Sequence, residues 1–133
     1  MTPEELVSVS HQHALELPAT SRDQPFGEGW DAYRVRGKIF MIYAHPLFNP
    51  ARTQMIILKA IPDEGVSLRQ QYDEITPGYH MNKTHWNSVV AGPGISPELV
   101  KDLITDSYLC VVDKLPKAKQ PVDPFNHRLT QFL

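Results

Sequence analysis

Apolar residues recur every three to four positions near the start of the chain, as they do on one face of a helix. Leu6 and Val9 follow this spacing, which predicts a helix over residues 3–17. Thr2 offers a capping hydroxyl, a proline occupies the first helical position, and Glu5 completes a capping box. The start of this helix is therefore specified locally.

The spacing changes to an alternation that is typical of strands in the next third of the chain. We predict strands over residues 30–36, 38–44 and 53–60, with a hairpin turn at Gly37. Both faces of the third strand carry apolar residues, which predicts a place at the centre of the sheet. Residues 18–29 contain two prolines and two glycines, and we expect a loop there.

Breaks with proline and glycine divide the second half of the chain into further elements. We predict a helix from residue 62 to about 72, a break at 76–78 and a strand over 87–90. Ser96 then caps the most strongly amphipathic helix, which ends before Pro116. Hairpin-linked strands are antiparallel neighbours, so this order predicts an α+β fold of two layers, with helices packed on one face of a mostly antiparallel sheet.

The composition indicates one folded domain. With 133 residues, 41% of them hydrophobic, the chain is long enough to bury a core. We expect a single domain over residues 1–117 and a proline-rich C-terminal extension over 118–133. No apolar run approaches the roughly 20 residues of a membrane helix, and the acidic N-terminus lacks the features of a signal peptide. We therefore expect a cytoplasmic protein without a membrane partner, present as a monomer or a weak homo-oligomer.

Few residues offer catalytic or metal-binding chemistry. Cys110 is the single cysteine, and its place on an apolar helix stripe predicts a core residue rather than a nucleophile. Neither a helix nor a strand would bring two histidine rings to one ion at the spacings found here, which are two residues for His11 and His13 and five residues for His80 and His85. We expect no catalytic residues, no metal and no cofactor.

Polar, cationic and aromatic side chains concentrate in residues 79–87. In a nucleic-acid interface, lysine contacts phosphates, asparagine reads base edges, and a histidine or tryptophan ring stacks on bases. In the structural alternative, Trp86 and Tyr79 anchor the loop to the core. His80 and Asn82 would then satisfy backbone groups. The contact residues that we predict here are His80, Asn82, Lys83, His85, Trp86 and Asn87.

A second cationic feature lies in the first predicted hairpin. Arg34, Arg36 and Lys38 alternate with apolar residues, which predicts a cationic strand face that contacts the same ligand. Residues 114–133 add four Lys or Arg against one Asp, whereas the first helix carries three Glu and no Lys or Arg. The net charge of −2 excludes a globally polybasic DNA-coating protein, so any DNA binding depends on such local charge.

The sequence from residue 79 to 87, followed by a helix that contains Asp106-Ser107-Tyr108, resembles the MmcQ/YjbR-like family. The helix at residues 68–72, the break at 76–78 and the closing segment at 114–117 also match, so the resemblance covers about residues 3–117. It implies an antiparallel sheet with packed helices, similar to frataxin-like proteins, and a double-wing DNA-binding module. It implies no catalytic residues.

Two functions follow as hypotheses. The first is a non-enzymatic, regulatory DNA-binding module that makes two to four phosphate contacts, which would give weak and salt-sensitive binding. The alternative is a module that binds a small molecule or a protein, with the loop at 79–87 and Arg69 lining a pocket beside Lys59, Tyr72 and Tyr108.

Overall fold

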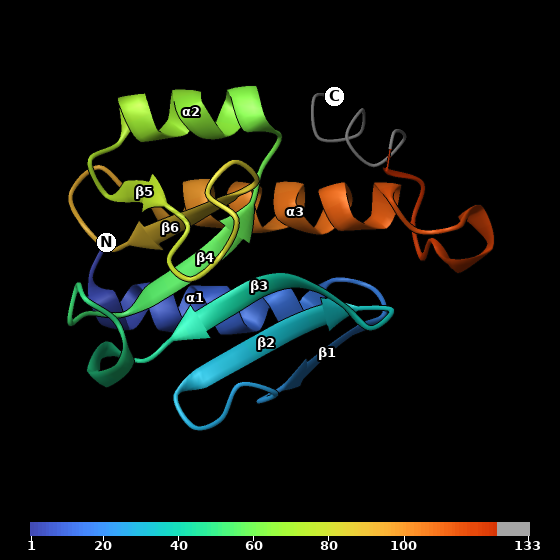
Figure 1. The fold of residues 1–133 in the computed structure, drawn as a ribbon, viewed down its shortest axis with the longest axis horizontal. Coiled ribbons are helices and arrows are strands. Elements are labelled where there is room, and N and C mark those ends of the chain that lie inside the picture. Colours follow the sequence, from blue (N-terminus) through green and yellow to red (C-terminus); the bar gives the residue numbers. More distant parts are fainter. Residues whose placement is uncertain (125–133) are drawn as a thin grey trace.

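A sheet of six strands, antiparallel at every pairing, runs through the part of the chain that the computed structural model describes, residues 1–124 (Figure 1). The strand order is β1-β2-β3-β4-β6-β5, so β3 and β4 lie at the centre. The strands are β1 (Thr20–Asp23), β2 (Trp30–Val35), β3 (Lys38–Ala44), β4 (Met55–Lys59), β5 (Ile75–Pro77) and β6 (Trp86–Val90). The α-helices are α1 (Pro3–Glu16), α2 (Pro62–Gln71) and α3 (Pro97–Asp113), and the short 3-10 turns are η1 (Pro46–Phe48) and η2 (Lys117–Lys119).

The helices pack on one face of this sheet. Helix α3 lies across β3 and β4 and contacts α1, and α2 lies beside β5 and β6 (Figure 1). The predicted capping box at Thr2 is present, and the Ser96 hydroxyl accepts a hydrogen bond from the backbone N–H of Leu99. The predicted α+β fold is confirmed.

Two edge strands were not predicted. The segment at 18–29 contains β1, whose exposed residues carry no apolar alternation and become a strand only by pairing with β2. The predicted break at 76–78 overlaps β5, which pairs with β6 and tolerates Pro77 because it lies at the sheet edge. Both predictions of irregular structure are therefore wrong at these positions.

Apolar side chains pack on both faces of the sheet. Ile56 and Leu58 of β4 belong to the main core beneath the helices, and Met55 and Ile57 belong to a second cluster on the opposite face, called here the outer face. The central place predicted for this strand is confirmed. The loop between β5 and β6 covers the outer face, because its residues Tyr79 and Met81 pack on the second cluster; further partly buried members are Trp30, Ile39, Trp86 and Val90.

Helix α3 is fixed across one end of the sheet by the buried side chain of Ser107. Its hydroxyl donates to the backbone oxygen of Phe40 in β3 at 2.5 Å and accepts from the backbone N–H of Lys59 in β4 at 2.8 Å. Within residues 1–124, no helix has both the length and the apolar content that a bilayer crossing requires. Of the predicted extension at 118–133, residues 125–133 lie outside the described part of the chain.

Candidate functional site

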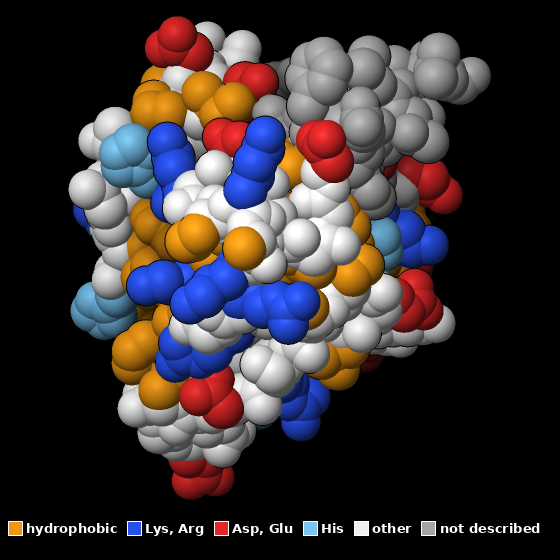
Figure 2. All heavy atoms as spheres, turned by 90° about the vertical axis from the view of Figure 1, so that its right-hand side faces the viewer, with side chains coloured by type: hydrophobic (Ala, Val, Ile, Leu, Met, Phe, Trp, Pro, Cys, Tyr) orange, Lys and Arg blue, Asp and Glu red, His pale blue; other side chains and the backbone are white. Residues whose placement is uncertain are grey.

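Cationic side chains gather at one end of the sheet. Val35 pairs with Lys38, and Lys59 pairs with Trp86, so β2 and β4 end where β3 and β6 begin. The C-terminal end of α3 and the following η2 reach the same end, where Arg36 Nε donates to the backbone oxygen of Lys119 at 3.2 Å. Figure 2 shows blue Lys and Arg side chains spread across the middle of this face. We call this surface the basic end: Arg34, Arg36, Lys38, Lys59, Lys83, Lys114, Lys117 and Lys119.

The opposite end of the sheet is acidic. The N-terminal ends of α1 and α3 lie there, since the Met1 ammonium donates to the backbone oxygen of Gly92, just after β6. Glu74 also lies there and accepts a hydrogen bond from the N–H of Gly94 at 2.8 Å. The net charge of −2 therefore hides an uneven charge distribution, in which Glu64, Asp113 and Asp123 stand among the cations of the basic end and Arg52 stands at the acidic end. The acidic side chains at this end are Glu4, Glu5, Glu28, Asp31, Glu74 and Glu98.

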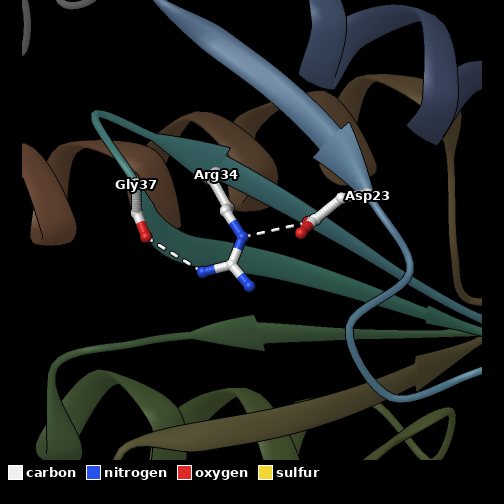
Figure 3. A network of polar contacts seen from close by, with 3 residues as sticks. All are labelled: Asp23, Arg34 and Gly37. Atoms are coloured by element: carbon white, nitrogen blue, oxygen red, sulfur yellow. Dashed lines mark hydrogen bonds and ion pairs between the residues drawn. The ribbon is translucent and has the colours of Figure 1, made fainter.

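Arg34 is held in place within the basic end. Its Nε lies 2.9 Å from Asp23 Oδ1, and its Nη1 donates to the backbone oxygen of Gly37 at 2.9 Å (Figure 3). The side chain is 25% exposed. Asp23 compensates part of its charge, so Arg34 contributes a fixed donor rather than a free cation.

The predicted cationic strand face is not formed. A register shift follows Tyr33, after which Arg34 pairs with Ile39 on the outer face and Lys38 pairs with Val35 of the helix-side core. Arg36 occupies the hairpin turn itself, with a φ of 49°. The three cations therefore surround the end of the hairpin instead of following one face of a strand.

Asn87 does not belong to the exposed surface. Only 3% of it is exposed, and its Nδ2 donates to the backbone oxygen of Gly65 at 3.2 Å. Its Oδ1 accepts from Arg69 Nη1 at 2.7 Å. Both partners come from α2, so the amide fastens α2 to β6, and its predicted contact role is wrong.

The other predicted loop residues divide between shaping the loop and facing solvent. Asn82 is exposed, and its Oδ1 accepts from the N–H of Thr84 at 2.9 Å, which forms a local turn. Lys83 is exposed at the basic end, where its Nζ donates to the backbone oxygen of Gly78. Trp86 is half-buried with Lys59 Nζ 6.0 Å from its ring centre. Lys59 therefore covers the ring that was predicted to stack on bases.

His85 is exposed on a cleft of about 330 Å³ at the basic end. Lys59 and Lys114 line the same cleft, together with the carboxylate of Asp113. This cleft places an imidazole ring beside two ammonium groups of the basic end. Asp113 lowers the local positive charge without cancelling it.

His80 lies apart from the basic end, on the outer face. The loop carries it to an aromatic groove of about 250 Å³, where its ring centre lies 4.1 Å from that of Tyr79. Phe26 and Trp30 line the same groove, and sequence reasoning did not select them. One signal in the sequence could have indicated Phe26: it stands between Pro25 and Gly27 in a predicted loop, where an aromatic side chain is not expected to be buried. The groove is lined by Phe26, Trp30, Ile42, Tyr79, His80 and Met81.

Besides the cleft at His85, Lys59 lines an enclosed cavity that is too small for an organic ligand. The cavity between α2, α3 and the sheet has a volume of about 30 Å³, room for about one water molecule. Tyr72 and Tyr108 do not line it, and the Tyr108 hydroxyl instead donates to the backbone oxygen of Pro18. Burial raises the pKa of Tyr108 to about 12. This phenol is a structural donor.

A separate group of titratable side chains lies between α1 and the sheet. The ring of His11 packs against Tyr33 and Tyr43, with ring centres 5.4 and 5.1 Å away. Burial lowers the pKa of His11, Arg22 lowers it further, and Asp31 opposes the shift. Within residues 1–124, no three His, Cys, Asp or Glu side chains come together in an arrangement that could hold a metal ion.

A family model described as YjbR matches residues 15–110. The chain belongs to the YjbR family. The Escherichia coli O157:H7 protein YbdF is 42% identical over 120 residues, which cover 90% of this chain and 95% of YbdF. The Escherichia coli K12 protein YjbR is 27% identical over 111 residues, which cover 82% of this chain and 89% of that protein. The resemblance found in the sequence is thus confirmed.

Solved structures agree with the YjbR-family assignment. The Deinococcus radiodurans protein DR2400, of domain family DUF419, superposes with a TM-score of 0.76 at 29% identity and covers 89% of this chain and 87% of that one. A Pseudomonas syringae protein superposes with a TM-score of 0.61, also at 29% identity, and the match covers 72% of this chain and 90% of that one. The YjbR match ends at residue 110, so Lys114, Lys117 and Lys119 of the basic end lie beyond it.

Proposed function

We propose that this YjbR-family protein is a non-enzymatic DNA-binding module that contacts the phosphate backbone through its basic end. The observation that carries the proposal is the gathering of cations from four separate segments of the chain at one end of the sheet, where they outnumber the nearby carboxylates. This arrangement supplies the local positive charge that DNA binding requires in a protein with a net charge of −2. A polyanion approaches the positive end and is repelled by the acidic one.

Several cations of the basic end are available to phosphates. Lys38, Lys83, Lys117 and Lys119 are exposed, and flexible ammonium groups at a surface suit backbone contacts that carry no sequence information. About four phosphate contacts would give a log–log salt slope of about −3.6. Affinity would then fall on the order of 100-fold between 50 and 200 mM salt.

The test is fluorescence polarisation of a labelled duplex, titrated with the protein at several salt concentrations. The Lys38→Ala/Lys119→Ala variant removes two charges from the basic end. We expect at least tenfold weaker binding at low salt and a salt slope reduced by about 1.8, because two counterion-releasing contacts are lost. An Arg52→Ala/Lys101→Ala variant is the matched control, since it removes the same charge from exposed positions elsewhere.

The control should bind the duplex with the salt slope of the unmodified protein. Equal losses in both variants would show that net charge, and not the basic end, determines the affinity. No change in polarisation at high micromolar protein and low salt would overturn the proposed function itself.

A further inference from the structure

We infer that the aromatic groove on the outer face binds an unpaired nucleobase, so that the nucleic acid recognised by this protein is single-stranded at that point. The inference rests on the proposed function, because it names the form of the ligand of the basic end. The groove is a separate surface from the basic end and is formed by the loop before β2, by β2 and β3, and by the loop after β5.

The rings of the groove are arranged for stacking. Trp30 and Tyr79 lie nearly parallel, with an interplanar angle of 18° and ring centres 6.0 Å apart. His80 extends the same aromatic surface, and Phe26 stands at its open side with 57% of its surface exposed. An aromatic side chain left this exposed is available to a flat partner.

The size and chemistry of the groove select a flat, mostly apolar group. Its volume of about 250 Å³ lies just below the range of roughly 300–1,000 Å³ that drug-sized ligands occupy. Its polar side-chain groups are the His80 imidazole, the Tyr79 hydroxyl and the Trp30 indole N–H, so the groove offers ring faces and few hydrogen-bonding groups. Stacking on such a surface accepts any base, because every base has a π-face.

The backbone holds His80 against the neighbouring rings. Its φ of 58° lies in the left-handed region, which is uncommon for a residue other than glycine. The turn at Asn82 follows directly and closes the loop. The exposed ring of His80 lies beside the rings of Tyr79 and Trp30 at the surface of the groove.

Strand β2 links the groove to the basic end, because each of the two surfaces includes a residue on its outer face. Trp30 and Arg34 are four residues apart on the same face, roughly 13 Å along the strand. A few nucleotides of an extended strand bridge this distance, so one chain can place a phosphate at Arg34 and a base in the groove. Bases in an intact duplex are stacked inside it and cannot enter the groove.

The test uses the two tryptophans of the chain. In a Trp86→Phe variant, Trp30 is the remaining tryptophan, and its fluorescence reports on the groove. We expect titration with oligo-thymidine to quench Trp30 at saturation and a duplex of equal length to leave it unchanged. Polarisation of the labelled oligonucleotides, measured on the same samples, reports binding to either form.

A second variant examines the groove without altering either tryptophan. Phe26→Ala removes an exposed ring and should weaken oligo-thymidine binding at least fivefold while leaving duplex affinity unchanged. Leu47→Ala is the matched control, because it removes an apolar side chain that is 70% exposed and does not line the groove. Circular dichroism of each variant checks that the fold is intact.

The outcomes separate the two proposals. Duplex and oligo-thymidine binding with equal affinity and unchanged Trp30 fluorescence would overturn the base-binding inference and leave the proposed function standing. Full oligo-thymidine affinity in Phe26→Ala would overturn it as well. Binding of neither nucleic acid would overturn both.

Discussion

Replacing Asn87 by alanine should lower stability without a direct effect on ligand binding. The side chain is 3% exposed and makes two hydrogen bonds to α2, one to the backbone of Gly65 and one from the guanidinium of Arg69. The neutral bond contributes about 1 kcal/mol and the charge-assisted bond about 1.5–3 kcal/mol. Arg69 is half-buried and recovers part of its loss by solvation, so we expect the free energy of unfolding to fall by about 2–3 kcal/mol.

Urea denaturation followed by circular dichroism measures this loss. With a slope of about 1.5–2 kcal/mol per molar urea, the midpoint should move down by about 1–2 M. Asn82→Ala is the matched control, because its amide is exposed and makes one local bond to Thr84, so its midpoint should change little. A change below about 0.5 kcal/mol for Asn87→Ala, together with weaker duplex binding, would restore Asn87 as a contact residue and refute the reasoning.

Three further changes examine the packing that positions the site. Ser107→Ala removes the hydroxyl that joins α3 to β3 and β4, and chemical denaturation should show that the free energy of unfolding falls by about 2–3 kcal/mol. The control Ser67→Ala changes an exposed serine, and its free energy of unfolding should stay close to that of the unmodified protein. Gly78→Ala places a Cβ 2.7 Å from that of Trp86, so the melting temperature should fall, and an unchanged value would contradict the close approach. Burial lowers the pKa of His11 below its usual value of 6.5. The imidazole therefore binds a proton more readily in the unfolded chain than in the folded one, and the free energy of unfolding should decrease as pH falls below 6.5. In thermal melts between pH 7 and pH 5, His11→Phe should show a smaller decrease in stability. An unchanged pH dependence would show that the His11 ring is not its cause.

The elements that the sequence predicted are those with local signals. The capping residues Thr2 and Ser96 fix where two helices begin, because each side chain satisfies a backbone N–H of its own first turn. The central position of β4 also followed from the sequence, since a strand with apolar residues on both faces must be covered on both. The edge strands β1 and β5 lack such signals, because pairing with a neighbour makes them strands.

The candidate site could be predicted only in part, because it depends on contacts between distant residues. The sequence identified Lys38 and Lys83 as cations, but the strand register and the docking of α3 bring them to one end with Lys119. It marked Asn87 as a polar residue of an exposed loop, and the packing of α2 buried it.

The sequence by itself determined the fold class, the helix starts and the apolar strands, because capping bonds and hydrophobic periodicity act over a few residues. Only the tertiary structure decided which polar side chains face solvent together. That outcome depends on strand register and helix docking, which join residues such as Arg36 and Lys119 across more than eighty positions of the chain.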